Sequence, residues 1–140
     1  VVGEMGIGNT TSSAALMATL TGLDAAECVG RGTGVDEAGL ARKTAVVRRA
    51  LAVNGLGGQS CVPPAAASPD AALRALAAVG GFEIAMMAGA MLGAASVRAL
   101  VFVDGFIATE AAAVPLAIDP ALKTFLVFAH VSAEAPHARW

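Results

Sequence analysis

Apolar and polar positions divide the chain into long segments with helical spacing and short, uniformly apolar runs. The long segments predict helices over residues 10–20, 36–54, 69–79, 82–95 and 107–116. The short runs predict strands over residues 1–2, 98–105 and 125–129. Gly and Pro separate these elements, so residues 24–29 are expected to form a short connection and residues 55–68 a loop.

Two of the predicted helices carry clear start signals. Asp36 precedes the second helix, in which Leu40 and Val47 share one apolar face and most of the basic residues lie on the other. Ser68 and Pro69 precede the third helix, with Pro at its first position, where the missing N–H costs nothing. Both starts predict well-defined helix boundaries.

The strands are apolar throughout and are separated by helices. This pattern indicates a parallel sheet that is covered by helices on both faces. A polar residue or cluster follows each strand: Glu4, Asp104, and the run His130-Val131-Ser132-Ala133-Glu134. Because the carboxyl ends of parallel strands share one edge, we expect these polar residues to meet in one crevice.

Length and composition limit the number of domains and indicate how apolar the surface is. The chain has 140 residues, the length of one domain; apolar residues make up 56%, charged residues 14%, and the mean hydropathy is +0.70. No apolar run reaches the length of a membrane-spanning helix. We expect more exposed apolar surface than a free-standing domain tolerates, explained by an oligomer or by a longer protein of which this is a piece. The start inside a strand and the end at Trp140 favour the piece.

Charge and reactive residues exclude several classes of function. The net charge is −2, which gives no electrostatic basis for binding nucleic acid, and one Trp with no Tyr makes a base-stacking surface unexpected. The two His and two Cys lie in four separate places and show no metal-ligand spacing. Cys28 and Cys61 are interpreted as small buried residues in a reducing, cytoplasmic compartment.

The first fifteen residues form a candidate phosphate-binding loop. Gly3, Gly6 and Gly8 follow the first apolar run, and Asn9, Thr10 and Thr11 are expected to cap the helix that comes next. A glycine-rich turn that leads into a helix N-terminus suits an anion. The spacing is neither the dinucleotide fingerprint nor Walker A, so a tight turn without any ligand is an equal alternative.

Six motifs in order resemble one family, the nicotinate-nucleotide–dimethylbenzimidazole phosphoribosyltransferases. The matching runs are residues 3–11 (Gly-Glu-Met-Gly-Ile-Gly-Asn-Thr-Thr), 29–34 (Val-Gly-Arg-Gly-Thr-Gly), 38–43 (Ala-Gly-Leu-Ala-Arg-Lys), 80–85 (Gly-Gly-Phe-Glu-Ile-Ala), 103–107 (Val-Asp-Gly-Phe-Ile) and 128–134 (Phe-Ala-His-Val-Ser-Ala-Glu). They extend over nearly the whole chain. Val131 and the Ala135-Pro136 pair depart from the family pattern in the last motif.

The resemblance implies an α/β fold, a Rossmann-like three-layer sandwich with a mainly parallel sheet and helices on both faces. Residues 1–140 would be the nucleotide-binding core of the large domain, with the small-domain segments absent. The implied reaction moves the phosphoribosyl group of nicotinate mononucleotide to 5,6-dimethylbenzimidazole, giving α-ribazole 5′-phosphate for cobalamin. It implies a homodimer with these small-molecule substrates, no cofactor, no metal and no membrane partner.

The resemblance also names candidate substrate-binding residues. Glu4 would face the ribose hydroxyls, and Lys43 would bind the 5′-phosphate, although a solvated helix lysine is the alternative from spacing alone. Asp104 is a weaker candidate, since an Asp-Gly turn is equally expected. The full candidate set is Glu4, Met5, Gly6, Gly8, Asn9, Thr10, Gly32, Thr33, Gly34, Lys43 and Asp104.

No catalytic residue is expected within the chain. The family's general base is a glutamate in a Gly-Glu-Gly run, which residues 1–140 do not contain, so little activity is expected from them alone. The roles of His130, Ser132 and Glu134 are open, a hydrolase triad is not indicated, and His137 is expected in a surface loop. A non-catalytic nucleotide-phosphate binding module and a structural piece without a ligand are the alternatives.

Overall fold

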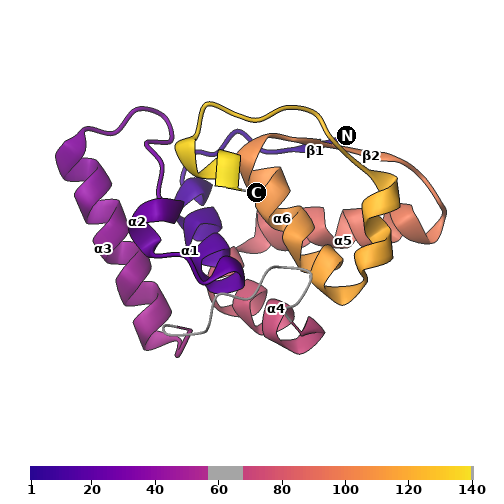
Figure 1. Ribbon diagram of the computed structural model, residues 1–140, viewed down its shortest axis with the longest axis horizontal. Coiled ribbons are helices and arrows are strands. Elements are labelled where there is room, and N and C mark those ends of the chain that lie inside the picture. The colour runs from indigo at the N-terminus through magenta and orange to yellow at the C-terminus, as the bar shows by residue number, and fades with distance from the viewer. Residues whose placement is uncertain (57–67, 140) are drawn as a thin grey trace.

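The structure is a computed structural model that describes residues 1–56 and 68–139 (Figure 1). Cys61 and the predicted loop between residues 57 and 67 lie outside the described residues. The elements are, in chain order, β1 (Val2–Gly3), α1 (Asn9–Thr21), α2 (Ala25–Cys28), α3 (Glu37–Val53), α4 (Pro69–Ala75), the π-helical turn η2 (Leu76–Gly80), α5 (Phe82–Ser96), β2 (Val101–Asp104), α6 (Gly105–Ile118), the 3₁₀ helix η3 (Pro120–Phe125), β3 (Leu126–Phe128) and the 3₁₀ helix η4 (Ala135–Arg139).

The described strands form a three-stranded sheet in the order β1-β2-β3, with both pairs parallel. Val2 pairs with Val103, and Val101 pairs with Leu126. All three strands therefore end at the same edge. The predicted α/β class with a parallel sheet is confirmed, and so is the shared edge after the strands.

The helices cover one face of this sheet. Both crossovers run in the same direction, from β1 to β2 and from β2 to β3, and right-handed crossovers in one direction place their helices on the same side. Accordingly α5 and α6 pack on each other and both reach β2, below the strands in Figure 1. Val101 and Val103 are buried, whereas Phe102 is 48% exposed on the opposite face. The second helical layer that we expected is not formed by the described residues.

Two alanine-rich helices form the centre of the core. In α6 every residue from Phe106 to Pro115 is buried, and in α1 every residue from Ser13 to Ala18 is buried. Small side chains let neighbouring backbones approach closely, and interiors must be packed to crystal-like density. The alanine content of the sequence is thus explained by helix packing. No helix among the described residues is long and apolar enough to cross a membrane.

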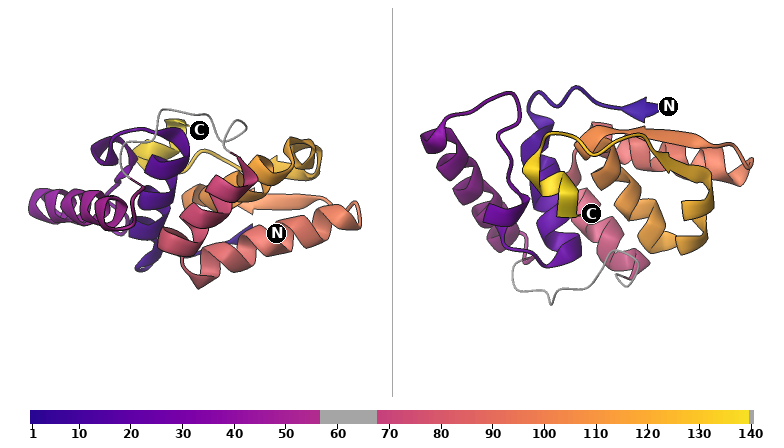
Figure 2. Two further views of the ribbon diagram at one scale, coloured as in Figure 1. Left: turned by 90° about the horizontal axis from the view of Figure 1, so that it is seen from below. Right: turned by 45° about the horizontal axis from the view of Figure 1, so that its top comes forward.

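The two predicted helix starts are confirmed. The Asp36 carboxylate accepts from Gly39 N at 2.7 Å at the start of α3, and the Ser68 hydroxyl accepts from Ala71 N at 3.2 Å at the start of α4. Val47 is buried on the inner face of α3, as its spacing predicted. Figure 2 shows that α3 lies at one end of the molecule and α5 at the other.

Several boundaries differ from the sequence prediction, and three of the differences have a local cause. Residues 25–28, expected as a connection, form α2, because Asp24 caps a turn by accepting from Ala26 N at 2.9 Å. The expected helix over residues 69–79 widens into the π-turn η2, where a Cβ on Gly80 would lie 2.5 Å from Leu76 Cδ1. The strand expected from residue 98 begins only at Val101, because Arg98 has a φ of 58° in the preceding turn.

Candidate functional site

The first glycine-rich loop joins β1 to α1 with a backbone that only glycine adopts easily. Gly6 and Gly8 have φ values of 96° and 88°. Gly8 is the N-cap of α1, so the expected capping by Asn9, Thr10 and Thr11 is wrong: these residues lie inside the helix. Among the described residues no side chain caps α1. The amides of its first turn therefore keep hydrogen-bonding capacity for an anion.

Lys43 connects α1 to the second glycine-rich loop, residues 30–34. Its Nζ donates to Thr10 Oγ1 at 2.9 Å and to the carbonyl oxygen of Gly30 at 3.0 Å. The side chain is half-buried, so the alternative of a fully solvated helix lysine is wrong. Burial lowers the pKa of Lys43, and the Glu134 carboxylate acts in the opposite direction. A cation thus lies beside the first turn of α1, as expected.

A cleft of about 210 Å³ opens next to Lys43, at the carboxyl edge of the sheet. It is lined from the candidate set by Glu4, Met5, Gly6, Thr10, Gly32 and Thr33. Residues that the candidate set did not include complete the lining: Gly105, Phe106, Ile107, Ser132 and Glu134. The crevice predicted from the polar residues after the strands is therefore present. Ser132 and Glu134 had been singled out in the sequence, but without a role.

The other candidates lie outside the lining of this cleft: Gly8, Asn9, Gly34, Lys43 and Asp104. Gly8 and Asn9 belong to the start of α1, and Gly34 to the outer part of the second loop. Asp104 faces away: its Oδ1 lies 3.2 Å from His130 Nδ1, and both side chains are about half exposed. The pair joins the end of β2 to the segment after β3, which favours a structural contact at Asp104.

Glu4, which lines the cleft, has one carboxylate oxygen whose hydrogen bonding is unsatisfied within the described part of the chain. Its Oε2 is buried and has no hydrogen-bond partner among the described residues. A buried polar atom without a partner costs about 1–3 kcal/mol. Because a carboxylate oxygen can only accept, a ligand hydroxyl is the type of group that would complete this site.

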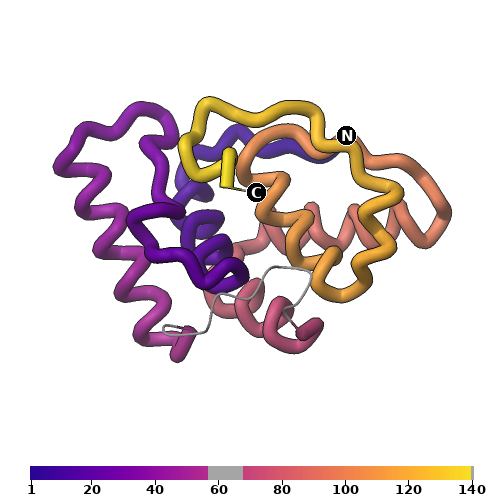
Figure 3. The backbone as a smooth tube through the Cα atoms, viewed as in Figure 1, coloured from indigo at the N-terminus to yellow at the C-terminus, as the bar shows by residue number. Residues whose placement is uncertain are grey.

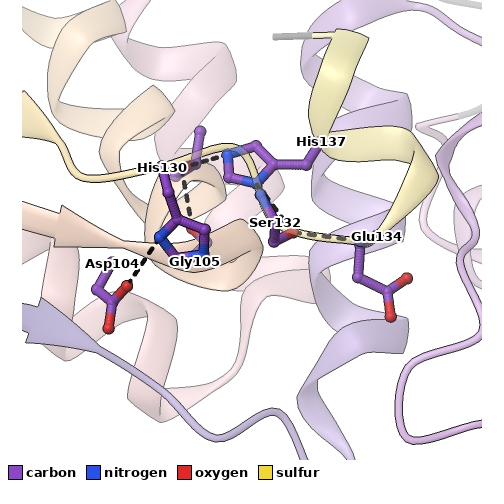
Figure 4. A network of polar contacts seen from close by, with 7 residues as sticks. Asp104, Gly105, His130, Ser132, Glu134 and His137 are labelled. Atoms are coloured by element: carbon purple, nitrogen blue, oxygen red, sulfur yellow. Dashed lines mark hydrogen bonds and ion pairs between the residues drawn. The ribbon is translucent and has the colours of Figure 1, made fainter.

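The loop after β3 is anchored by His137, which is buried at 5% exposure, so the expectation of a surface histidine is wrong. Its Nδ1 lies 2.9 Å from Ser132 N and 3.0 Å from Ser132 Oγ, and its Nε2 lies 3.0 Å from Thr109 Oγ1 (Figure 4). The partner of the second ring nitrogen is a hydroxyl. Nothing in this contact forms the carboxylate-histidine pair of a hydrolase triad.

A second hollow lies elsewhere and has a different character. It measures about 700 Å³ between α1, α3, α4 and α5, and no described residue that lines it is charged. It therefore lacks the cation that an anionic substrate needs. Among the described residues, no three His, Cys, Asp or Glu side chains gather closely enough to hold a metal ion.

Fold and cleft together define a class of protein. A parallel α/β domain has a cleft at the carboxyl edge of its strands. The cleft is lined by Thr10 of the first turn of α1 and by the acidic residues Glu4 and Glu134, and Lys43 donates to Thr10 beside it. This arrangement suits a small ligand that has both a phosphate group and hydroxyl groups.

Comparison with known proteins narrows the class. A model of the phosphoribosyltransferase family matches residues 1–140. The nicotinate-nucleotide–dimethylbenzimidazole phosphoribosyltransferase of Cupriavidus necator is 52% identical over 135 residues, 96% of this chain and 36% of that protein. Its counterpart in Ralstonia nicotianae is 54% identical over 136 residues, 97% of this chain and 35% of that protein.

Solved structures agree. CobT from Thermus thermophilus matches with a TM-score of 0.80 and 39% identity, over 95% of this chain and 36% of that one. The chain therefore belongs to the phosphoribosyltransferase family, and the resemblance predicted from its six motifs is confirmed. It spans about 36% of the length of the C. necator relative.

Proposed function

We propose that the cleft binds the nucleotide substrate of a phosphoribosyltransferase, nicotinate mononucleotide, with its 5′-phosphate between Lys43 and the first turn of α1. The observation that carries this proposal is the position of Lys43 Nζ, 2.9 Å from Thr10 Oγ1 and 3.0 Å from Gly30 O. Thr10 accepts from the ammonium, so its own hydroxyl hydrogen can be donated to a phosphate oxygen. The candidates Gly6, Gly8 and Asn9 would contribute backbone amides.

The ribose would lie toward Glu4. Its buried Oε2 lacks a donor among the described residues, and a ribose offers two hydroxyl donors. Gly32 and Thr33 would close the cleft from the second loop, with Met5 at its rim. Glu4 and Lys43 then hold opposite ends of the same phosphoribosyl group.

For the whole protein we propose the activity named in its relatives. The bond between C1′ and the nicotinate nitrogen breaks, and a nitrogen of 5,6-dimethylbenzimidazole bonds to C1′ from the opposite face. The products are nicotinate, α-ribazole 5′-phosphate, which is a precursor in cobalamin biosynthesis, and the proton released from the N–H group of dimethylbenzimidazole. Residues 1–140 would be the nucleotide-binding core of the large domain in a cytoplasmic homodimer. The apolar side chains that this chain exposes, such as Phe82 and Met86, are compatible with such an assembly.

Calorimetric titration with nicotinate mononucleotide tests the phosphate site. Replacing Lys43 with Ala is expected to weaken binding about 10- to 100-fold, since a hydrogen bond to a charged group contributes about 1.5–3 kcal/mol. Lys123→Ala is the matched control, because Lys123 is an exposed lysine on η3.

Nicotinate riboside, which lacks the phosphate, shows whether the loss of affinity in the Lys43→Ala variant depends on the phosphate group. Its affinity is expected to be the same for the wild type and the Lys43→Ala variant. Equal binding of the mononucleotide by the wild type and the Lys43→Ala variant would show that Lys43 does not contact the phosphate, and would refute the proposal.

A further inference from the structure

One continuous chain of hydrogen bonds joins α6 to the loop that forms the far wall of the cleft (Figure 4). Thr109 Oγ1 donates to Gly105 O at 2.9 Å and lies 3.0 Å from His137 Nε2. His137 Nδ1 in turn contacts Ser132, whose hydroxyl accepts from Glu134 N at 3.4 Å. Gly105, Ser132 and Glu134 all line the cleft. His137 therefore lies at the centre of a brace between two walls.

The direction of each hydrogen bond fixes the protonation state of the ring. The backbone N–H of Ser132 can only donate, so Nδ1, 2.9 Å away, must be an unprotonated acceptor. In the neutral ring the proton then lies on Nε2 and is donated to Thr109 Oγ1, whose own hydrogen goes to Gly105 O. A second proton on Nδ1 would face the Ser132 N–H directly, donor against donor.

The brace acts on the phosphate side as well. A Cβ on Gly30 would lie 1.6 Å from Glu134 Oε2, so the Glu134 carboxylate is packed against the residue whose carbonyl accepts from Lys43. Glu134 also raises the pKa of Lys43 by its charge. The position of Glu134 consequently sets part of the environment of the proposed phosphate ligand.

We propose that neutral His137 is a positioning residue that holds the Ser132–Glu134 wall of the nucleotide cleft against α6, and that protonation of His137 releases this wall and weakens nucleotide binding. The hydrogen bonds of the brace do not depend on any ligand, whereas the identity of the ligand rests on the function proposed above.

The surroundings of His137 favour the neutral ring at ordinary pH. Burial lowers the pKa of His137, and the nearby His130 acts in the same direction. α6 presents uncharged groups, the hydroxyl of Thr109 and the ring of Phe106 at a centroid distance of 6.0 Å. In η4 itself, Arg139 pairs with Glu27 of α2 at 3.1 Å. The neutral brace is thus intact above the usual histidine pKa of about 6.5 and is lost as the pH falls through the lowered value.

Two amide variants distinguish the roles of the two ring nitrogens. His137→Asn keeps an acceptor at the position of Nδ1 that cannot be protonated, and His137→Gln keeps a donor at the position of Nε2 but loses the acceptor for Ser132. We expect His137→Gln to weaken nicotinate mononucleotide binding about 3- to 10-fold at pH 8, as for the loss of one hydrogen bond. His137→Asn is expected to weaken it less.

The pH profile is the readout that a purely structural role would not change in this way. Binding is measured by calorimetry from pH 8 to pH 5 for the wild type and His137→Asn. The ratio of the two profiles removes the titration of the ligand phosphate, which both share. We expect the wild type to lose about 3- to 10-fold more affinity than His137→Asn as the pH falls. Parallel profiles would overturn the proposal.

A measurement without nucleotide keeps this test separate from the proposed function. The ¹⁵N shifts of the His137 ring and the protection of the Ser132 amide against hydrogen exchange are followed over the same pH range. We expect Nδ1 to be unprotonated at pH 8 and Ser132 protection to fall with ring protonation in the wild type only. A protonated Nδ1 at pH 8 would overturn the brace. Absence of nucleotide binding in every protein, with the brace observed, would refute the proposed function instead.

Discussion

The thiol of Cys28 is enclosed completely between α2 and the core, at 0% exposure. Burial raises the pKa of Cys28 to about 12, and the charge of Glu110 acts in the same direction. A thiol reacts with alkylating agents as the thiolate. We expect iodoacetamide at pH 8 to modify Cys28 about a thousandfold more slowly in the native protein than in the unfolded one, whose cysteine pKa is about 8.5.

The experiment uses a Cys61→Ser background, so that Cys28 is the only thiol, and mass spectrometry follows its alkylation with and without urea. The Cys28→Ser variant of the natural chain serves as the control for the assay. Similar rates in native and unfolded protein would show that the Cys28 thiolate is accessible in the fold.

Single residues also show what the sequence could and could not predict about the site. Glu4 and Thr10, which line the cleft, could be singled out because they lie within one recognisable motif, residues 3–11, next to a strand end. His137 was missed because its two partners, Thr109 and Ser132, come from different segments that meet only when η4 folds back onto α6. Hydrogen bonds across such separations leave no periodic signal in the sequence.

At the scale of elements, α5 offers a direct test of packing. Gly89 lies inside this helix, and a Cβ built there meets no atom within 4 Å. Alanine is favoured over glycine in a helix interior by about 0.5–1 kcal/mol. Gly89→Ala is therefore expected to raise the free energy of unfolding by that amount in urea denaturation.

The same substitution at Gly81 is the matched control. Gly81 precedes α5 with a φ of 82°, a conformation that strains an alanine, so Gly81→Ala is expected to lower stability. A loss of stability for Gly89→Ala would contradict the open surroundings of that side of α5.

Element boundaries were predictable where local chemistry defines them. The starts of α3 and α4 follow from Asp36 and Ser68, which cap the helices with their own side chains. The four residues of α2 are too few to display a helical period, and the widening at η2 depends on how Gly80 packs beneath Leu76. The first type of information can be read from a single capping residue, whereas the second depends on how a few neighbouring residues pack within one turn.

At the scale of the whole molecule, the chain provides one half of a proposed reaction site. The cleft would provide the proposed phosphate and ribose contacts, while the Gly-Glu-Gly run expected from the family is not among residues 1–140. A general base contributes about 10²–10⁴-fold to the rate. We expect this chain to bind nicotinate mononucleotide but to convert it with dimethylbenzimidazole at least about a hundredfold more slowly than the full-length C. necator relative.

Turnover is measured by chromatography of α-ribazole 5′-phosphate, with both proteins at the same active-site concentration. Rates comparable with those of the relative would contradict the expected dependence on an external base. Binding without any product would be the behaviour of the alternative, a non-catalytic nucleotide-phosphate module.

The described residues form one of the two helical layers that were predicted. Apolar strands predicted helices on both faces, yet the order β1-β2-β3 sends both crossovers to the same face and leaves Phe102 and Val127 partly exposed. Strand composition reports how apolar the environment of a strand is, but not which segment covers it. Figure 3 shows the trace after η3 returning along the strands toward α1.

Because the cleft lies at the carboxyl ends of the strands, the turn at residues 97–100 lies at the other end of β2. Leu100 is 62% exposed there. Once Cys61 is replaced, a fluorescent dye attached through a cysteine at position 100 would leave the ligand's entrance unobstructed. Ligand occupancy of the cleft could then be followed by changes in the fluorescence of the dye, because β2, which joins position 100 to the cleft edge, is only four residues long.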